Sequence, residues 1–141
     1  MDALPYAADC HCFAIRQAAR YITQLYERHM GRVGLSAAQF TILNRVDRTA
    51  QLTTQQLAEA MVMERTTLLR ALKPLQRDGL VETLPSATNR RATSLVLTDA
   101  GRSKIKAARL CWADAQREFE EQFGAKRAKA LRRELFEMTA A

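Results

Sequence analysis

Apolar residues recur every three or four positions along much of this chain, which is the period of an amphipathic helix. The longest such patterns cover residues 8–30, 98–121 and 125–138. Their apolar stripes are wider than a helix on the surface of a small monomer needs. We therefore expect the helices at the two ends of the chain to pair with a second copy, as a two-fold dimer.

Two capping motifs predict helices in the middle of the chain. Ser36 can cap a helix, and Gln39, three residues later, can reach back to its backbone. Thr53 and Gln56 repeat this arrangement. The second motif begins a short helix that we expect to cover residues 53–60.

The next stretch, residues 61–81, is predicted to form one helix that ends at Gly79. On a helical wheel its leucines share one face, and hydroxyl and cationic side chains occupy the other. A short helix, a tight turn and a basic helix together make a helix-turn-helix. Taken alone, residues 61–81 could also be an ordinary amphipathic surface helix. The leucines are Leu68, Leu69, Leu72 and Leu75, and the polar face carries Thr66, Thr67, Arg70, Lys73 and Arg77.

Two short β patterns follow, over residues 80–84 and 93–97, with a turn-rich loop between them. The chain has no acidic residue from Thr83 to Thr98. A strand, a basic loop and a strand directly after a helix-turn-helix form a wing, and an arginine at its tip suits the narrow, negative minor groove of DNA. A solvated hairpin tip is the alternative. The predicted fold is therefore mainly α with a small β-hairpin wing.

Composition narrows the class of partner. The chain has 141 residues, and 22 Lys and Arg against 15 Asp and Glu give a formal charge of +7. Such an excess favours nucleic acid or an anionic membrane surface. There is no apolar run of about 20 residues, no signal-peptide pattern, and an odd number of cysteines, which suits a reducing compartment. We expect one cytoplasmic domain over residues 1–141, with no membrane partner.

Enzyme motifs are missing from the sequence. It has no glycine-rich phosphate loop, no nucleophile elbow and no paired carboxylates beside a histidine. We therefore expect neither catalytic residues nor a cofactor. A sequence-independent architectural or RNA-binding protein is the remaining competing class, and it would bind any duplex, whereas a regulator discriminates by about 10³-fold or more.

This order of elements resembles the MarR family of bacterial winged-helix regulators, over nearly the whole chain. The most specific stretch is 63–75, which is similar to the family's recognition helix in a subgroup with the core R-T-T-L-x-R-x-L-x-P-L. Asn89-Arg90-Arg91, with Leu95, Leu97-Thr98 and Gly101, resembles the wing signature, although the family usually has Asp where this chain has Asn89. By resemblance, residues 8–30 and 98–141 would form the dimer and 35–97 the DNA-binding lobe. The major groove would be contacted by Arg65, Thr66, Thr67, Arg70 and Lys73, and the minor groove by Arg91.

The family typically represses genes until a small molecule or an oxidant weakens DNA binding, which leaves the signal open here. An aromatic or anionic organic effector between the dimerisation helices and the DNA-binding lobe is the first interpretation, with Arg16 and Arg20 as candidate carboxylate ligands. Cys12-Phe13-Ala14 resembles the start of the organic-hydroperoxide sensors, which suggests a thiol-based alternative. The tyrosines that usually support that cysteine are replaced by Ala37 and Phe40.

A metal site is the third interpretation, and we do not expect one. Cys10 and Cys12 are two residues apart and would point to different faces of a helix. His11, His29 and Cys111 add no zinc-type spacing.

Overall fold

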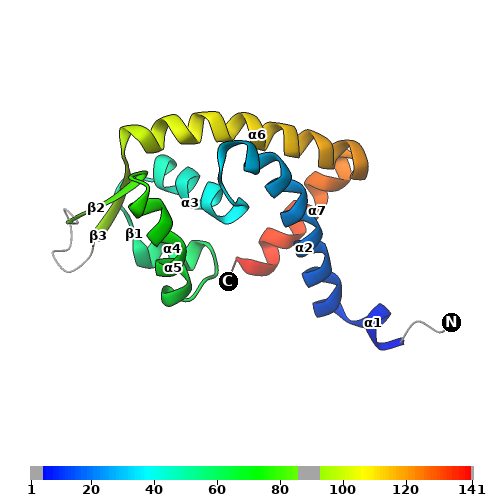
Figure 1. Cartoon of the computed structure of the whole chain (residues 1–141). Helices are drawn as coiled ribbons and strands as arrows, with labels where there is room; N and C mark the ends of the chain where they lie inside the picture. Colours follow the sequence, from blue (N-terminus) through cyan, green and yellow to red (C-terminus); the bar gives the residue numbers. More distant parts are fainter. Residues whose placement is uncertain (1–4, 86–92, 141) are drawn as a thin grey trace.

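A computed structural model describes residues 5–85 and 93–140 (Figure 1). The chain is mainly helical, with one small antiparallel sheet at one end. In the described ranges no helix is long and apolar enough to cross a membrane. The elements are α1 (Pro5–Asp9), α2 (His11–Met30), the 3₁₀ helix η1 (Gly31–Val33), α3 (Ala37–Arg48), β1 (Leu52–Thr53), α4 (Thr54–Ala60), α5 (Arg65–Arg77), β2 (Val81–Pro85), β3 (Thr93–Leu97), α6 (Asp99–Phe123) and α7 (Ala125–Thr139).

The long helix predicted from residue 8 is interrupted near its start. Cys10 has an extended backbone (φ −89°, ψ 112°) and caps α2, because its thiol accepts a hydrogen bond from the Phe13 amide at 3.4 Å. The single pattern over residues 8–30 is therefore split into α1 and α2 at Cys10. Serine or aspartate is the usual capping residue, and a cysteine at this position is therefore a weak signal for a helix start.

Both predicted capping boxes are confirmed. The Ser36 hydroxyl accepts from the Gln39 amide at 3.1 Å, and the Gln39 side chain accepts from the Ser36 amide at 2.9 Å. Thr53 and Gln56 make the same pair of bonds at 3.1 and 3.0 Å. Each cap satisfies amides that would otherwise lack a partner, and caps of this kind contribute about 1 kcal/mol.

The sheet has three strands in the order β1-β3-β2, not the two of the expected hairpin. β2 and β3 pair antiparallel from Val81 opposite Leu97 to Pro85 opposite Thr93. β1 adds Leu52 opposite Leu95. A strand of two residues is too short to show an alternating pattern, so the sequence could not reveal it.

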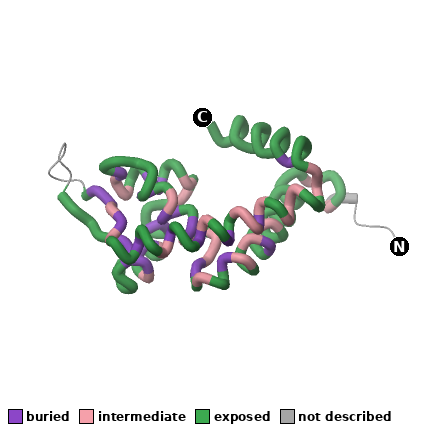
Figure 2. Tube along the Cα trace, turned by 90° about the horizontal axis from the view of Figure 1, so that it is seen from above, coloured by how far each residue is buried: buried purple, intermediate pink, exposed green. Residues whose placement is uncertain are grey.

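The hydrophobic core lies where α3, α4, α5, α6 and the sheet meet. Leu43, Leu57, Leu72, Leu95 and Ile105 are almost completely buried there. Figure 2 shows that burial decreases away from this lobe and that α7 is exposed along nearly its whole length. Ala128 is the single residue of α7 buried in the described structure.

The end of α5 is fixed by a glycine in the left-handed conformation. Gly79 has φ +72°, its amide donates to the Gln76 carbonyl at 3.1 Å, and the Leu80 amide donates to the Leu75 carbonyl at 2.9 Å. This is the Schellman arrangement, which closes a helix and turns the chain sharply. The predicted helix end at Gly79 is confirmed within one residue, since Asp78 is the C-cap.

The start of α6 is joined to that same turn. The Thr98 amide donates to the Leu80 carbonyl at 3.1 Å, and the Thr98 hydroxyl donates to the Gly79 carbonyl. The Thr98 hydroxyl also accepts from the Gly101 amide at 3.0 Å and so caps α6. Gly101 packs so closely that an added Cβ would overlap the Leu80 carbonyl oxygen.

Replacement of Gly101 by alanine should therefore destabilise the fold. The new Cβ would collide with backbone, which cannot move aside as a flexible side chain could, so we expect a loss of about 2–3 kcal/mol in the free energy of unfolding. Gly31→Ala is the matched control, because a Cβ there meets nothing within 4 Å. It should change stability by less than about 0.5 kcal/mol. Equal effects of the two variants in urea unfolding would contradict the close packing.

Candidate nucleic-acid interface

The turn between α4 and α5 takes a conformation that the sequence did not predict. The helix expected over residues 61–81 begins at Arg65, because the chain first closes α4. The Met63 amide donates to the Ala58 carbonyl at 2.9 Å across Val62, whose φ is +52°. A β-branched residue in the left-handed region costs about 1–2 kcal/mol, and glycine is the usual signal. The helix-turn-helix itself is present, with a four-residue connection.

Three leucines attach α5 to the lobe. Leu68, Leu72 and Leu75 are each at most 1% exposed. Leu69, which we predicted to share their face, is 39% exposed, so that prediction was wrong. At about 100° per residue, Leu69 lies roughly 60–120° around the helix from the other three. The buried arc of α5 is therefore narrower than the predicted face, because it holds three of the four leucines.

The opposite side of α5 is a polar surface that carries positive charge. Arg65, Thr66, Thr67, Arg70 and Lys73 are all exposed, as predicted, and no acidic residue lies within the helix. Across residues 5–85 and 93–140, none of these three cations forms an ion pair. Such a surface suits phosphates and base edges, because its charges are not neutralised within the described protein.

The wing is described only at its base. β2 and β3 extend from the lobe beside α5 (Figure 1), and β2 is exposed from Glu82 to Pro85. The tip residues Asn89, Arg90 and Arg91 lie outside the described residues. Their predicted contacts are neither supported nor opposed by the structure.

A cavity of about 440 Å³ lies between α2, α6 and α7. Its wall is mainly apolar and includes five aromatic side chains, while Arg132 and Glu120 add one cation and one carboxylate. At its edge the Tyr26 hydroxyl donates to the Gln116 side chain, and burial, with Glu120 next, raises the pKa of the Tyr26 phenol. The aromatic lining residues are Tyr21, Tyr26, Phe119, Phe123 and Phe136.

The predicted effector residues are not part of this cavity. Arg16 and Arg20 are exposed on α2, and neither lines it. Sequence reasoning missed Arg132 because the cavity joins helices that are about a hundred residues apart. Only the aromatic residues at helical spacing on α6, Phe119 and Phe123, gave a signal.

The three cysteines lie in three different environments. Cys12 is exposed on α2, Cys10 caps that helix and Cys111 is buried in α6. Within the part of the chain that is described, no three potential metal ligands cluster. Ala37 is half-buried and Phe40 is buried, and neither carries the hydroxyl group that the resemblance to hydroperoxide sensors would lead one to expect.

The chain is similar to known regulators in sequence and in structure. The sequence model of the MarR family matches residues 33–92. An uncharacterized HTH-type transcriptional regulator of Bacillus subtilis, YybA, is 27% identical over 88 residues, which are 62% of this chain and 59% of that relative. The match thus spans less than two thirds of the curated relative's length.

Two solved structures show how far the structural similarity extends. The M. tuberculosis transcriptional regulator MosR in complex with DNA is 32% identical, with a TM-score of 0.82 and coverage of 93% of this chain and 94% of that one. CouR from Rhodococcus jostii RHA1 bound to p-coumaroyl-CoA has a TM-score of 0.80 and 94% coverage of both chains. Its identity is 16%, so that similarity concerns the fold alone.

Proposed function

The chain belongs to the MarR family of DNA-binding transcriptional regulators, and on that premise we propose that it is a dimeric repressor released from a pseudo-palindromic operator by a small organic effector. The observation that carries the DNA-binding part is the exposed face of α5. Its cations are unpaired within the described residues, and its opposite side is anchored by three buried leucines. Members of this class are regulators rather than enzymes.

The base-reading contacts are assigned to α5. Arg65 and Thr66 lie in its first turn, and Arg70 and Lys73 follow on the same exposed side with Thr67 beside them. A recognition helix in the major groove presents its N-terminal residues to base edges. Arginine and lysine suit guanine O6 and N7, and threonine suits phosphate or a thymine methyl group.

The wing is assigned to the minor groove. Asn89, Arg90 and Arg91 would form its tip, with Arg91 inserted where the groove is narrow and its negative potential is strong. Asn89 can still hydrogen-bond to hold the tip, although it lacks the charge-assisted contribution of an aspartate.

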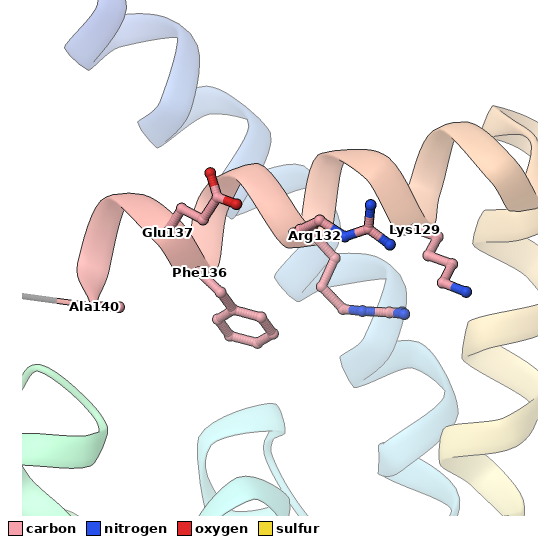
Figure 3. Close-up of a pocket in the computed structure, with 6 residues that line it drawn as sticks. Lys129, Arg132, Phe136, Glu137 and Ala140 are labelled. Carbon is pink, nitrogen blue, oxygen red and sulfur yellow. The ribbon is translucent and has the colours of Figure 1, made fainter.

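The dimer is assigned to the end helices, residues 8–30 and 98–141, with 35–97 as the DNA-binding lobe. Apolar side chains on α2 and α7 are left without cover in the single chain: Phe13 is 46% exposed and Phe136 is 64% exposed. Figure 3 shows Phe136 pointing away from α7 and Arg132 beside it. A second copy would cover these surfaces and place two α5 helices about 34–36 Å apart, one turn of DNA.

The effector is assigned to the cavity between α2, α6 and α7. An apolar, aromatic-lined site of this size with a few polar groups is typical of small-molecule pockets. Arg132 could bind a carboxylate or phosphate, and the Tyr26–Gln116 pair offers further hydrogen bonds. Arg16 and Arg20 do not line this cavity, so the effector contacts are assigned to Arg132 instead. The exposed Cys12 supports one competing input, thiol oxidation by hydroperoxide.

Replacement of Arg70 by alanine tests direct readout. We expect a loss of about 1–3 kcal/mol in binding to the operator and a smaller loss on random duplex. Arg117→Ala is the control, because Arg117 is an exposed cation on α6 that already pairs with Asp114 at 3.5 Å. It should leave affinity almost unchanged. The contrary result is that the native protein binds operator and random duplex equally and that Arg70→Ala weakens both by the same factor. The protein would then be a non-specific nucleic-acid-binding protein.

Replacement of Leu135 by arginine tests the dimer. Leu135 lies in the exposed apolar stripe of α7, and an unpaired charge buried in an interface costs about 3–5 kcal/mol. Sedimentation at micromolar concentration should show a dimer for the native chain and a monomer for this variant. Leu84→Arg introduces the same change on β2, outside the helices assigned to the dimer, where Leu84 is 47% exposed, and should stay dimeric. A monomeric native chain would refute the assignment.

A ligand screen tests the effector. Aromatic acids, their coenzyme A thioesters and phenols should include a compound that raises the melting temperature and weakens operator binding. We expect Arg132→Ala to lower its affinity about tenfold, the loss of one charge-assisted hydrogen bond, and Arg16→Ala to leave it unchanged. If hydroperoxide releases the native protein from DNA but not Cys12→Ser, the thiol mechanism replaces this proposal.

A further inference from the structure

One side chain on the DNA-facing surface of α5 does not fit a chemistry of charges and hydroxyl groups. Leu69 is 39% exposed, although the three other leucines of the same helix are at most 1% exposed. The core cluster and the half-buried residues packed against it include Ala71 and Met63 but not Leu69. Leu69 therefore does not serve mainly to hold α5 in place.

The position of Leu69 on the helix places it among the proposed DNA contacts. Arg65 and Thr66 precede it by four and three residues, and Lys73 follows it by four, so all three are its neighbours on the helix surface. Each of these neighbours is exposed. If they engage one half-site, Leu69 is carried into the same groove with them.

We propose that Leu69 contacts the 5-methyl group of a thymine in the major groove and so selects thymine at one position of each half-site. This inference rests on the proposed function and adds a residue that determines base preference. The thymine methyl is the apolar group that base edges present in the major groove. A leucine has no donor or acceptor, so it gains nothing from guanine, cytosine or adenine edges.

The same contact disfavours cytosine by a second route. Cytosine presents an N4 amino donor in the major groove and lacks the methyl group. An apolar side chain placed over that donor excludes water without replacing its hydrogen bond, which is unfavourable. Leu69 thus separates thymine from cytosine by attraction to one and by desolvation of the other.

Deoxyuridine substitution tests this contact by removing one methyl group at a time. The operator is first selected from random duplexes with the native protein, and each thymine is then replaced in turn by deoxyuridine. We expect one thymine in each half-site at which the native protein loses about fourfold in affinity, the contribution of one buried methyl group. Leu69→Ala should bind the unmodified operator more weakly and should no longer respond to deoxyuridine at that position.

Two matched variants show whether the effect belongs to Leu69. Leu69→Met keeps an apolar side chain of similar volume and should keep the response to deoxyuridine. Leu84→Ala removes another exposed leucine, on β2, and should also keep it. The inference is overturned if no thymine responds in the native protein, or if Leu69→Ala responds as strongly as the native protein. Failure to select any sequence would overturn the proposed function as well, whereas a selected operator without a methyl response overturns only the role of Leu69.

Discussion

The turn at Gly79 and Leu80 is the constraint on which the rest of the molecule depends. It ends α5, begins β2 and accepts the first turn of α6 through the bond from Thr98 to the Leu80 carbonyl. Gly101 lets α6 approach to backbone contact. The proposed recognition helix, the first strand of the wing and the longest helix therefore meet at one closely packed, hydrogen-bonded turn. A shift of the start of α6 would act directly on the turn that ends α5, because Thr98 is hydrogen-bonded to the carbonyl groups of both Gly79 and Leu80.

Features set by neighbouring residues were predictable from the sequence. The capping boxes at Ser36 and Thr53 and the helix end at Gly79 each depend on residues within one turn, where hydrogen-bonding capacity and backbone freedom decide the outcome. Features that depend on contacts between residues far apart in the sequence could not be predicted in this way. β1 exists because Leu52 meets Leu95, and the left-handed backbone at Val62 carries no local signal.

The candidate site divides in the same way. The exposed cations of α5 could be read from the sequence, since one helix carries them all. The cavity could not, because Tyr26, Gln116 and Arg132 belong to three different helices. Leu69 is an intermediate case. The helical wheel correctly predicted which side of α5 faces the core, but it overestimated how wide the buried arc is. Three leucines fill the space beneath α5, and the fourth is left outside.

The weak attachment of α7 connects assembly to regulation. A helix that buries one residue in its own chain needs another surface to hold it, and most helical stability in proteins comes from packing. In the proposed dimer the partner supplies that surface. The cavity lies between α7, α2 and α6, so an effector there would contact the same helices that join the two subunits. Since α6 is fixed to the turn that ends α5, a ligand that changes how these helices pack would change the separation of the two recognition helices. In the proposed complex the operator would set that separation at about one helical turn, and a ligand that binds better to a different spacing would weaken operator binding by the same factor.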